Sequence, residues 1–240
     1  WHGARFRIWD GIRALDYLES RPDIDSGKLA IMGQSGGGTL TSYIAALDTR
    51  VKASCPAGFV TTSRDLVEFW GPQDCEQNIP GAMKLGLNHL SLMMMASPRP
   101  VELILAEDDA FPPFGSFTTL AKMRELYARL GIPERVDYNI AMGKMHGWYD
   151  CSREASVRWV RRWLTGVDAP APKVADEDAL PPAENEADAF VVPGGMVSSL
   201  PGERGTYDII RTRADALAAK RPPLTRELVA KVSGIDVAHP

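Results

Sequence analysis

Hydrophobic and polar positions follow two different periods in the first part of the chain. Apolar residues recur at helical spacing over Ile8–Leu18, and Arg21-Pro22 ends the run. A compact apolar run at Leu29–Met32 is typical of a strand buried on both faces. The same order repeats further on, with a helix predicted over Thr39–Leu47 and a strand over Val51–Cys55.

The alternation lapses after this second strand and then resumes. We interpret residues 57–98, which include a helix-like segment at Met83–Met95, as an insertion over the sheet edge. The later strands are predicted at Val101–Ala106 and Arg135–Ile140, and the later helices at Thr118–Leu130 and Ser152–Leu164. Strands that alternate with helices form a mostly parallel sheet flanked by helices, because each crossover must run back along the sheet. The predicted fold class is therefore α/β.

The composition changes beyond Gly166. Residues 167–189 are rich in Pro, Ala, Asp and Glu, which predicts an acidic linker with little to bury. A strand-like segment from Phe190, a turn at Pro201-Gly202 and a helix at about Tyr207–Lys220 follow. Residues 190–240 are too few for a second core, so we expect a tail or the start of a further module.

Composition and charge exclude several classes of protein. A chain of 240 residues with 45% hydrophobic and 24% charged residues is typical of a globular protein with one sizeable core. Its apolar runs fall far short of the roughly 20 residues that span a bilayer, so no membrane span is predicted. A net charge of -4 with scattered basic residues does not favour nucleic acid as a partner. The three cysteines match neither a zinc site nor a disulfide framework.

The segment Gly33-Gln34-Ser35-Gly36-Gly37 has the pattern Gly-x-Ser-x-Gly between a predicted strand and a predicted helix. That context favours a nucleophilic serine on a sharp, strained turn. Gly33 and Gly37 are expected where a Cβ would strike the adjoining strand or helix. The Gly36 N–H at the start of the helix is a candidate oxyanion donor.

Two other interpretations of the turn are a plain strand-to-helix link and a phosphate-binding loop. A phosphate loop would have a lysine close behind its glycines, whereas Thr39 and Leu40 follow here.

The nucleophile hypothesis also requires a histidine to act as base. His146 is preferred, because it lies in a loop between the last predicted strand and the closing helix, which faces the same sheet edge as Ser35. The remaining histidines are His2, His89 and His239.

A third group must orient the imidazole and stabilise its charged form. Glu107, Asp108 and Asp109 immediately follow a predicted buried strand, so each could project at the active edge. Asp109 is preferred, Asp108 remains a competitor, and Glu107 is expected to point to solvent. The chain order serine, acid, histidine agrees with a nucleophile on a strand-to-helix turn.

Further motifs accompany these residues. They are Trp9-Asp10-Gly11, Arg21-Pro22, the turn Gly33–Gly38, Gly71-Pro72-Gln73-Asp74 and His146-Gly147. Together they resemble the α/β-hydrolase superfamily, and within it the acetyl-xylan-esterase-like and prolyl-oligopeptidase-like bacterial hydrolases. The resemblance runs from about Ile8 to Leu164. It implies that Asp109, two residues before Phe111, is the acid. It also implies that residues 1–166 are the C-terminal part of a hydrolase domain, without the first strands and the second oxyanion amide that the superfamily has before the helix at Ile8.

These residues predict a serine hydrolase that cleaves carboxylic esters through an acyl-enzyme and needs no metal or organic cofactor. The resemblance implies a small-molecule ester or an acylated carbohydrate as substrate. A prolyl-oligopeptidase-type peptidase and a non-catalytic hydrolase-like binding module are the alternatives. Candidate substrate-binding residues are Gln34, Trp70, Phe111 and Trp148. The three aromatic residues could line a substrate cleft together with Phe114, although such residues more often serve packing alone.

Overall fold

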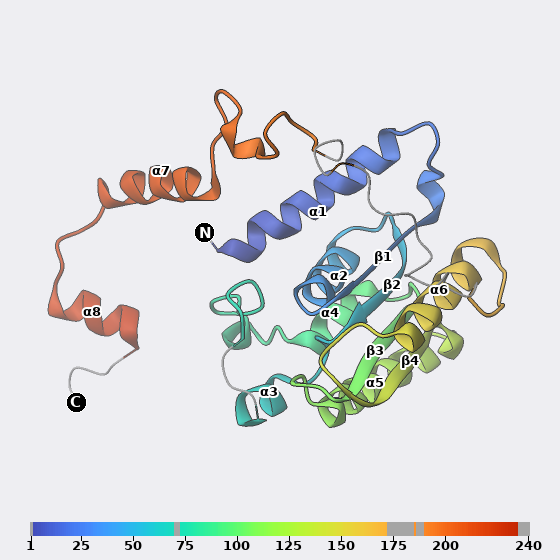
Figure 1. Cartoon of the computed structure of the whole chain (residues 1–240). Helices are drawn as coiled ribbons and strands as arrows, with labels where there is room; N and C mark the ends of the chain where they lie inside the picture. The colour runs from blue at the N-terminus through green and yellow to red at the C-terminus, as the bar shows by residue number, and fades with distance from the viewer. Residues whose placement is uncertain (1, 70–72, 172–184, 186–189, 235–240) are drawn as a thin grey trace. The chain divides into compact units, whose positions relative to one another are not determined.

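The computed structural model describes residues 2–69, 73–171, 185 and 190–234 (Figure 1). The chain forms two compact units, Trp1–Glu177 and Asp178–Pro240. The first unit holds a four-stranded parallel sheet in the order β1-β2-β3-β4. The strands are β1 (Leu29–Gln34), β2 (Val51–Ala57), β3 (Val101–Asp108) and β4 (Val136–Met145).

Helices and short 3-10 turns connect these strands. The helices are α1 (Gly3–Ser20), α2 (Gly36–Leu47), α3 (Ser63–Phe69), α4 (His89–Ala96), α5 (Pro113–Arg129) and α6 (Asp150–Thr165). The 3-10 turns are η1 (Ser26–Lys28), η2 (Met83–Leu85) and η3 (Pro133–Arg135). The alternation of strands and helices predicted from the hydrophobic pattern is thus confirmed, with most boundaries shifted by a few residues.

Side-chain alternation along β3 divides the core into two layers. Leu103 and Leu105 belong to a large buried cluster shared with α1, α2, α4 and α5. Ile104 between them belongs to a smaller cluster with Trp159 of α6. This is the two-residue period of a strand that is covered on both faces. Helices therefore flank the sheet on both sides (Figure 1).

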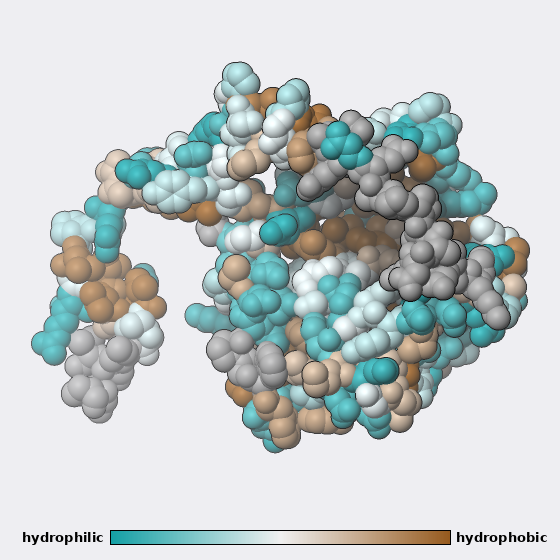
Figure 2. All heavy atoms as spheres, viewed as in Figure 1, coloured by the Kyte–Doolittle hydropathy of each residue, from teal (hydrophilic) through white to brown (hydrophobic). Residues whose placement is uncertain are grey.

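The α6 side of the sheet is less completely covered over β1. Figure 2 shows hydrophobic residues gathered in a hollow between α1 and α6, where Figure 1 places β1. Met32 of β1 is among the exposed large apolar side chains. The prediction that Leu29–Met32 is buried on both faces is therefore wrong on this side, because α6 packs over Ala57 and Ile104 of the neighbouring strands and leaves Met32 39% exposed.

The helix-like segment Met83–Met95 is not one helix. It forms η2 and α4, separated by Gly86, which has a left-handed φ of 73° that most residues avoid within a helix. Asn88 then caps α4, since its side chain accepts a hydrogen bond from the Ser91 N–H. The sequence prediction was wrong here because apolar content outweighed the stop signal of the glycine.

The second unit contains α7 (Thr206–Ala218) and α8 (Arg226–Ser233). The helix predicted at Tyr207–Lys220 corresponds to α7, whereas α8 was not predicted. The strand-like segment predicted from Phe190 is wrong, because turns and the 3-10 turn η6 (Val197–Ser199) occupy that part of the chain. Gly194 and Gly195 both have positive φ, which breaks an extended strand.

Candidate active site

Ser35 lies in a strained turn between β1 and α2. Its φ of 59° makes it the one non-glycine residue with positive φ in the described part of the chain. Such a conformation costs about 1–3 kcal/mol and persists where neighbours hold it. The Ser35 N–H donates to the Ala57 carbonyl of β2 at 2.9 Å, and its carbonyl accepts from the Thr39 N–H at 2.9 Å. These contacts hold the half-buried serine at the carboxyl end of β1.

Glycines make this turn possible at two points. A Cβ on Gly33 would lie 2.6 Å from the Gly37 carbonyl oxygen, so no larger residue fits there. A Cβ on Gly37 would meet nothing within 4 Å, which corrects the expectation that this position must be small. The close approach occurs one residue later, where a Cβ on Gly38 would overlap the Ala57 carbonyl because α2 packs against β2 there.

Gly36 is the first residue of α2. Its N–H is one of the helix amides that have no partner inside the helix, and the helix dipole favours negative charge beside it. Glu76 from the segment between β2 and β3 approaches the same end of the helix, since its Oε1 lies 3.0 Å from where a Cβ of Gly36 would be. The Glu76 carboxylate therefore lies close to the first residue of α2.

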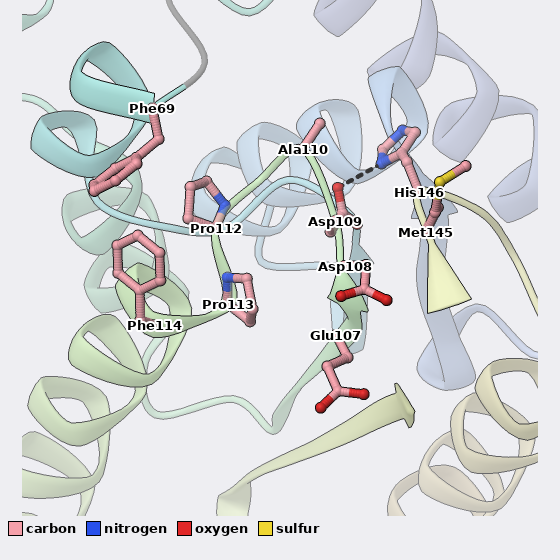
Figure 3. Close-up of a pocket in the computed structure, with 10 residues that line it drawn as sticks. All are labelled: Phe69, Glu107, Asp108, Asp109, Ala110, Pro112, Pro113, Phe114, Met145 and His146. Carbon is pink, nitrogen blue, oxygen red and sulfur yellow. Dashed lines mark hydrogen bonds and ion pairs between the residues drawn. The ribbon is translucent and has the colours of Figure 1, made fainter. Parts of the chain in front are cut away.

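Asp109 and His146 form a hydrogen-bonded pair beside this turn (Figure 3). The His146 Nδ1 lies 2.8 Å from the Asp109 Oδ1. The Asp109 side chain is only 3% exposed, and Oδ1 also accepts from the Phe111 N–H at 2.9 Å. Because a carboxylate can only accept, Nδ1 carries the proton in the neutral ring and Nε2 is left free to accept another.

The neighbouring acids lie differently. Asp108 ends β3 and is exposed, with its backbone paired to Met145 of β4. Glu107 is exposed, as expected, and its Oε2 accepts from the Gly143 N–H at 2.7 Å and so ties β3 to β4. In Figure 3, both carboxylates are directed away from the imidazole. The imidazole therefore bonds Asp109 and neither of its two neighbours.

Gly58, which directly follows β2, places the imidazole next to the serine turn. A Cβ on Gly58 would lie 2.9 Å from the His146 Cε1 and 2.5 Å from the Gln34 Nε2. The imidazole and the residue before Ser35 therefore pack against the same glycine. Within the described residues, no hydrogen bond joins the Ser35 hydroxyl to the imidazole, and such bonds are often long without substrate. Sequence reasoning missed Gly58, whose only signal was its place after a predicted strand.

A cavity of about 560 Å³ opens beside the imidazole (Figure 3). Acidic residues and His146 border one side of it, and the rings of Phe69 and Phe114 border the other. These two rings meet edge to face with their centroids 5.0 Å apart. The volume falls within the range of small-molecule sites, which is roughly 300–1,000 Å³.

None of the candidate substrate-binding residues that the structure describes lines this cavity. Phe111 is buried and stacks on the His146 ring at 5.6 Å between centroids, so it packs against the imidazole and does not line the cavity. Trp148 packs with Trp159 on the α6 face of the sheet. The Gln34 Nε2 is buried near His146 and has no hydrogen-bond partner in the described residues. Trp70 lies outside the described residues.

Two of the other histidines have structural contacts of their own. The His2 Nδ1 accepts from the Ala4 N–H at 3.3 Å and caps α1. The His89 Nδ1 accepts from the Thr61 N–H at 3.1 Å, and its ring packs on Phe59. Burial lowers the pKa of His89 to about 4, so its ring is neutral at pH 7. His239 lies outside the described residues.

The part of the chain that the structure describes contains no group of three or more His, Cys, Asp or Glu residues that could hold a metal ion. Within the same residues, every helix is too short or too polar to cross a membrane.

Among known proteins, a family model described as the prolyl oligopeptidase family matches residues 7–166 of this chain. A curated relative from Bacillus subtilis (strain 168), named "Putative hydrolase YtaP", is 25% identical over 168 residues. That alignment covers 65% of this chain and 53% of the relative. This chain thus spans about half the length of that relative.

Two solved structures share the fold. A carbohydrate esterase family 15 glucuronoyl esterase from Caldicellulosiruptor kristjansonii has a TM-score of 0.57 and 18% identity, covering 71% of this chain and 54% of its own. Methylesterase BT1017 has a TM-score of 0.57 and 24% identity, covering 65% of this chain and 34% of its own. Residues of this chain therefore adopt the α/β-hydrolase fold that the sequence predicts, over part of the length of these relatives.

Proposed function

This chain belongs to the prolyl oligopeptidase family, and from that membership we propose that it carries the active site of a serine hydrolase that cleaves carboxylic esters. The observation that supports this most directly is the buried Asp109 bonded to the His146 Nδ1 at 2.8 Å. It leaves Nε2 free beside the strained turn that holds Ser35. The names of both solved neighbours, a glucuronoyl esterase and a methylesterase, favour an ester over an amide.

In the proposed reaction, His146 Nε2 takes the proton of the Ser35 hydroxyl while Oγ attacks the ester carbonyl carbon. The Gly36 N–H donates to the oxyanion that forms on the carbonyl oxygen. Collapse of this intermediate breaks the ester bond, and the leaving alcohol takes the proton from His146. Water, deprotonated by the same nitrogen, then attacks the acyl-enzyme and releases the acid and free Ser35.

Asp109 has a positioning role in this scheme. It holds the proton on Nδ1 and stabilises the imidazolium that forms when Nε2 accepts the serine proton. Phe111 stacks on the His146 ring, and its N–H donates to the Asp109 Oδ1. Phe111 therefore contacts both members of the Asp109–His146 pair. An acylated carbohydrate is the proposed substrate class, on the resemblance to acetyl xylan esterases and on the names of the carbohydrate-esterase neighbours.

The test is hydrolysis of p-nitrophenyl acetate by the full chain and by Ser35→Ala. We expect release of p-nitrophenol to fall to the uncatalysed rate in the variant, and a fluorophosphonate probe to label wild type but not the variant. A Thr118→Ala variant on α5 serves as a control, since Thr118 is exposed and does not line the cavity beside His146. Absence of labelling at Ser35 in the wild-type chain would instead favour a non-catalytic binding module.

Family membership itself supports one second candidate, a serine peptidase. The same nucleophile and base would then act on a peptide amide, whose leaving amine needs protonation by His146 before the bond breaks. Measuring kcat/KM for p-nitrophenyl acetate and for a prolyl p-nitroanilide distinguishes an esterase from a peptidase. A higher kcat/KM on the anilide would favour the peptidase.

A further inference from the structure

A second cavity lies between α3, the segment 73–88 and α4. Its volume is about 750 Å³, and Tyr43 of α2 contributes to its wall. None of the three proposed triad residues lines it. Its apolar lining includes Leu66, Val67, Ile79, Met83, Leu87 and Leu92. A cavity of roughly 300–1,000 Å³ with predominantly apolar walls is typical of a small-molecule site.

Two of the residues that line this cavity have side-chain amide groups without a hydrogen-bond partner in the described residues. Gln77 is only 9% exposed, and its Nε2 has no hydrogen-bond partner in the described residues. The Gln73 Nε2 is buried without a partner in the same way. Leaving a buried polar group unpaired is unfavourable, whereas an oxygen of a bound molecule would satisfy it. Two such amides in one cavity wall point to a ligand with acceptor oxygens.

His89 adds a further donor. Because its Nδ1 accepts from the Thr61 N–H, the single proton of the neutral ring must lie on Nε2. His89 is also part of the cavity wall. A neutral ring with an N–H free to donate is suited to a carbonyl or hydroxyl oxygen rather than to a cation.

The charges of the residues that line the cavity favour an uncharged ligand. Lys84 is the one charged residue among those that line the cavity, and it is exposed, so water already solvates its ammonium group. A charged ligand would have to leave water for apolar walls without a buried counter-charge, which is costly. We propose that this cavity binds an uncharged, mainly apolar small molecule whose carbonyl or hydroxyl oxygen accepts hydrogen bonds from Gln73 and Gln77.

This site differs from the proposed catalytic centre and does not depend on its activity. The test therefore uses the full chain carrying Ser35→Ala, so that binding is measured without hydrolysis. The probe is prodan, an uncharged naphthalene with one ketone oxygen, whose emission shifts to the blue in an apolar site. We expect a saturable blue shift as the protein is titrated into the probe.

Two variants on that background test the cavity itself. Gln77→Met keeps the side-chain volume but removes the donor, and should weaken prodan binding about 5- to 30-fold. Val67→Trp fills the cavity from an exposed position on α3 and should abolish the saturable shift. Glu134→Met, an exposed position in η3, is the control and should bind like the parent.

Equal prodan affinity in the parent and in both cavity variants, or no saturable shift in the parent, would overturn the proposal. Circular dichroism spectra show whether each variant is folded. If Gln77→Met were unfolded, Val67→Trp alone would decide, because its exposed side chain leaves the core intact.

Discussion

At the residue scale, the carboxylate that holds His146 determines how the imidazole can act. Asp109 is buried and bonded both to Nδ1 and to the Phe111 N–H, whereas Asp108 one residue earlier is exposed. An amide at position 109 could donate to Nδ1 and so stabilise the wrong tautomer. Asp109 is therefore the acid on which the proposed chemistry depends.

We predict that Asp109→Asn lowers kcat for p-nitrophenyl acetate by about 10³- to 10⁴-fold, because Nε2 would then carry the proton instead of accepting one. Asp108→Asn is the matched control and should change kcat by less than about threefold, given the small effects of surface substitutions. Steady-state kinetics of both variants measure this. If the two losses were reversed, Asp108 would be the acid.

Glu102 on β3 is a second residue whose surroundings decide its ionisation. Its side chain is 7% exposed and its Oε2 has no hydrogen-bond partner in the described residues. Burial, together with the nearby Asp137, raises the pKa of the Glu102 carboxyl to about 7, and Arg158 opposes the shift. Because the unfolded chain loses this proton near pH 4.5, the folded chain binds more protons between pH 4.5 and 7. The free energy of unfolding therefore falls as pH rises through this window.

Glu102→Gln should remove this pH dependence, since the amide does not ionise. At pH 8 we expect the variant to exceed wild type in free energy of unfolding by up to about 3 kcal/mol, and the gain to disappear at pH 4. Urea unfolding at pH 4, 6 and 8 measures it, with the exposed Glu134→Gln as control. A gain that grew toward acidic pH would contradict the assignment.

At the element scale, the approach of α2 to β1 and β2 determines the shape of the turn at Ser35. The start of the helix lies so close to the strands that Gly33 and Gly38 have no room for a Cβ, while Gly37 has open space. The strain at Ser35 is held by hydrogen bonds to Ala57 and Thr39. The turn geometry is therefore a product of strand and helix packing, and not of the pentapeptide pattern alone.

This contrast predicts opposite effects for two similar substitutions. Gly33→Ala places a Cβ against the Gly37 backbone and should destabilise the protein by about 1–3 kcal/mol, as overpacking does. Gly37→Ala meets no atom and improves helix propensity, so it should be neutral or stabilise by up to about 1 kcal/mol. Thermal unfolding of both variants measures these changes in stability, and an equal loss of stability in the two would refute the steric argument.

At the scale of the whole molecule, the two compact units differ in how much they bury. The first unit contains the sheet and both buried clusters. In the second, α7 has no buried residue and α8 has only Ala230. Short helices without a buried apolar face are marginal in water. The second unit should therefore open locally far more often than the first.

Limited proteolysis tests this difference. Trypsin should cut first at basic residues such as Arg211 and Lys220, and much later at Arg124 and Arg129, which are exposed but lie on the packed helix α5. Mass spectrometry of the early fragments identifies the sites. Early cleavage in α5 at a rate similar to that in α7 would show that the units are equally protected.

The sequence by itself determined the order along the chain of the four sheet strands and of helices α1, α2, α5 and α6, the α/β class and the strand-to-helix turn at Ser35. These follow from local periodicity and glycine placement, which record the face that each element buries. It also indicated His146 as the candidate base among the four histidines, and three neighbouring residues, Glu107, Asp108 and Asp109, as candidates for the acid. Both indications rest on the fact that the carboxyl ends of parallel strands share one sheet edge.

Only the tertiary structure decided which acid bonds the imidazole, that Gly58 makes room for it, and that Gly38 rather than Gly37 must be small. It also separated Trp148, on the α6 face, from the cavity beside His146. Each of these depends on distances between segments far apart in the chain. Such distances arise from how elements pack together, and no local pattern of residues encodes them.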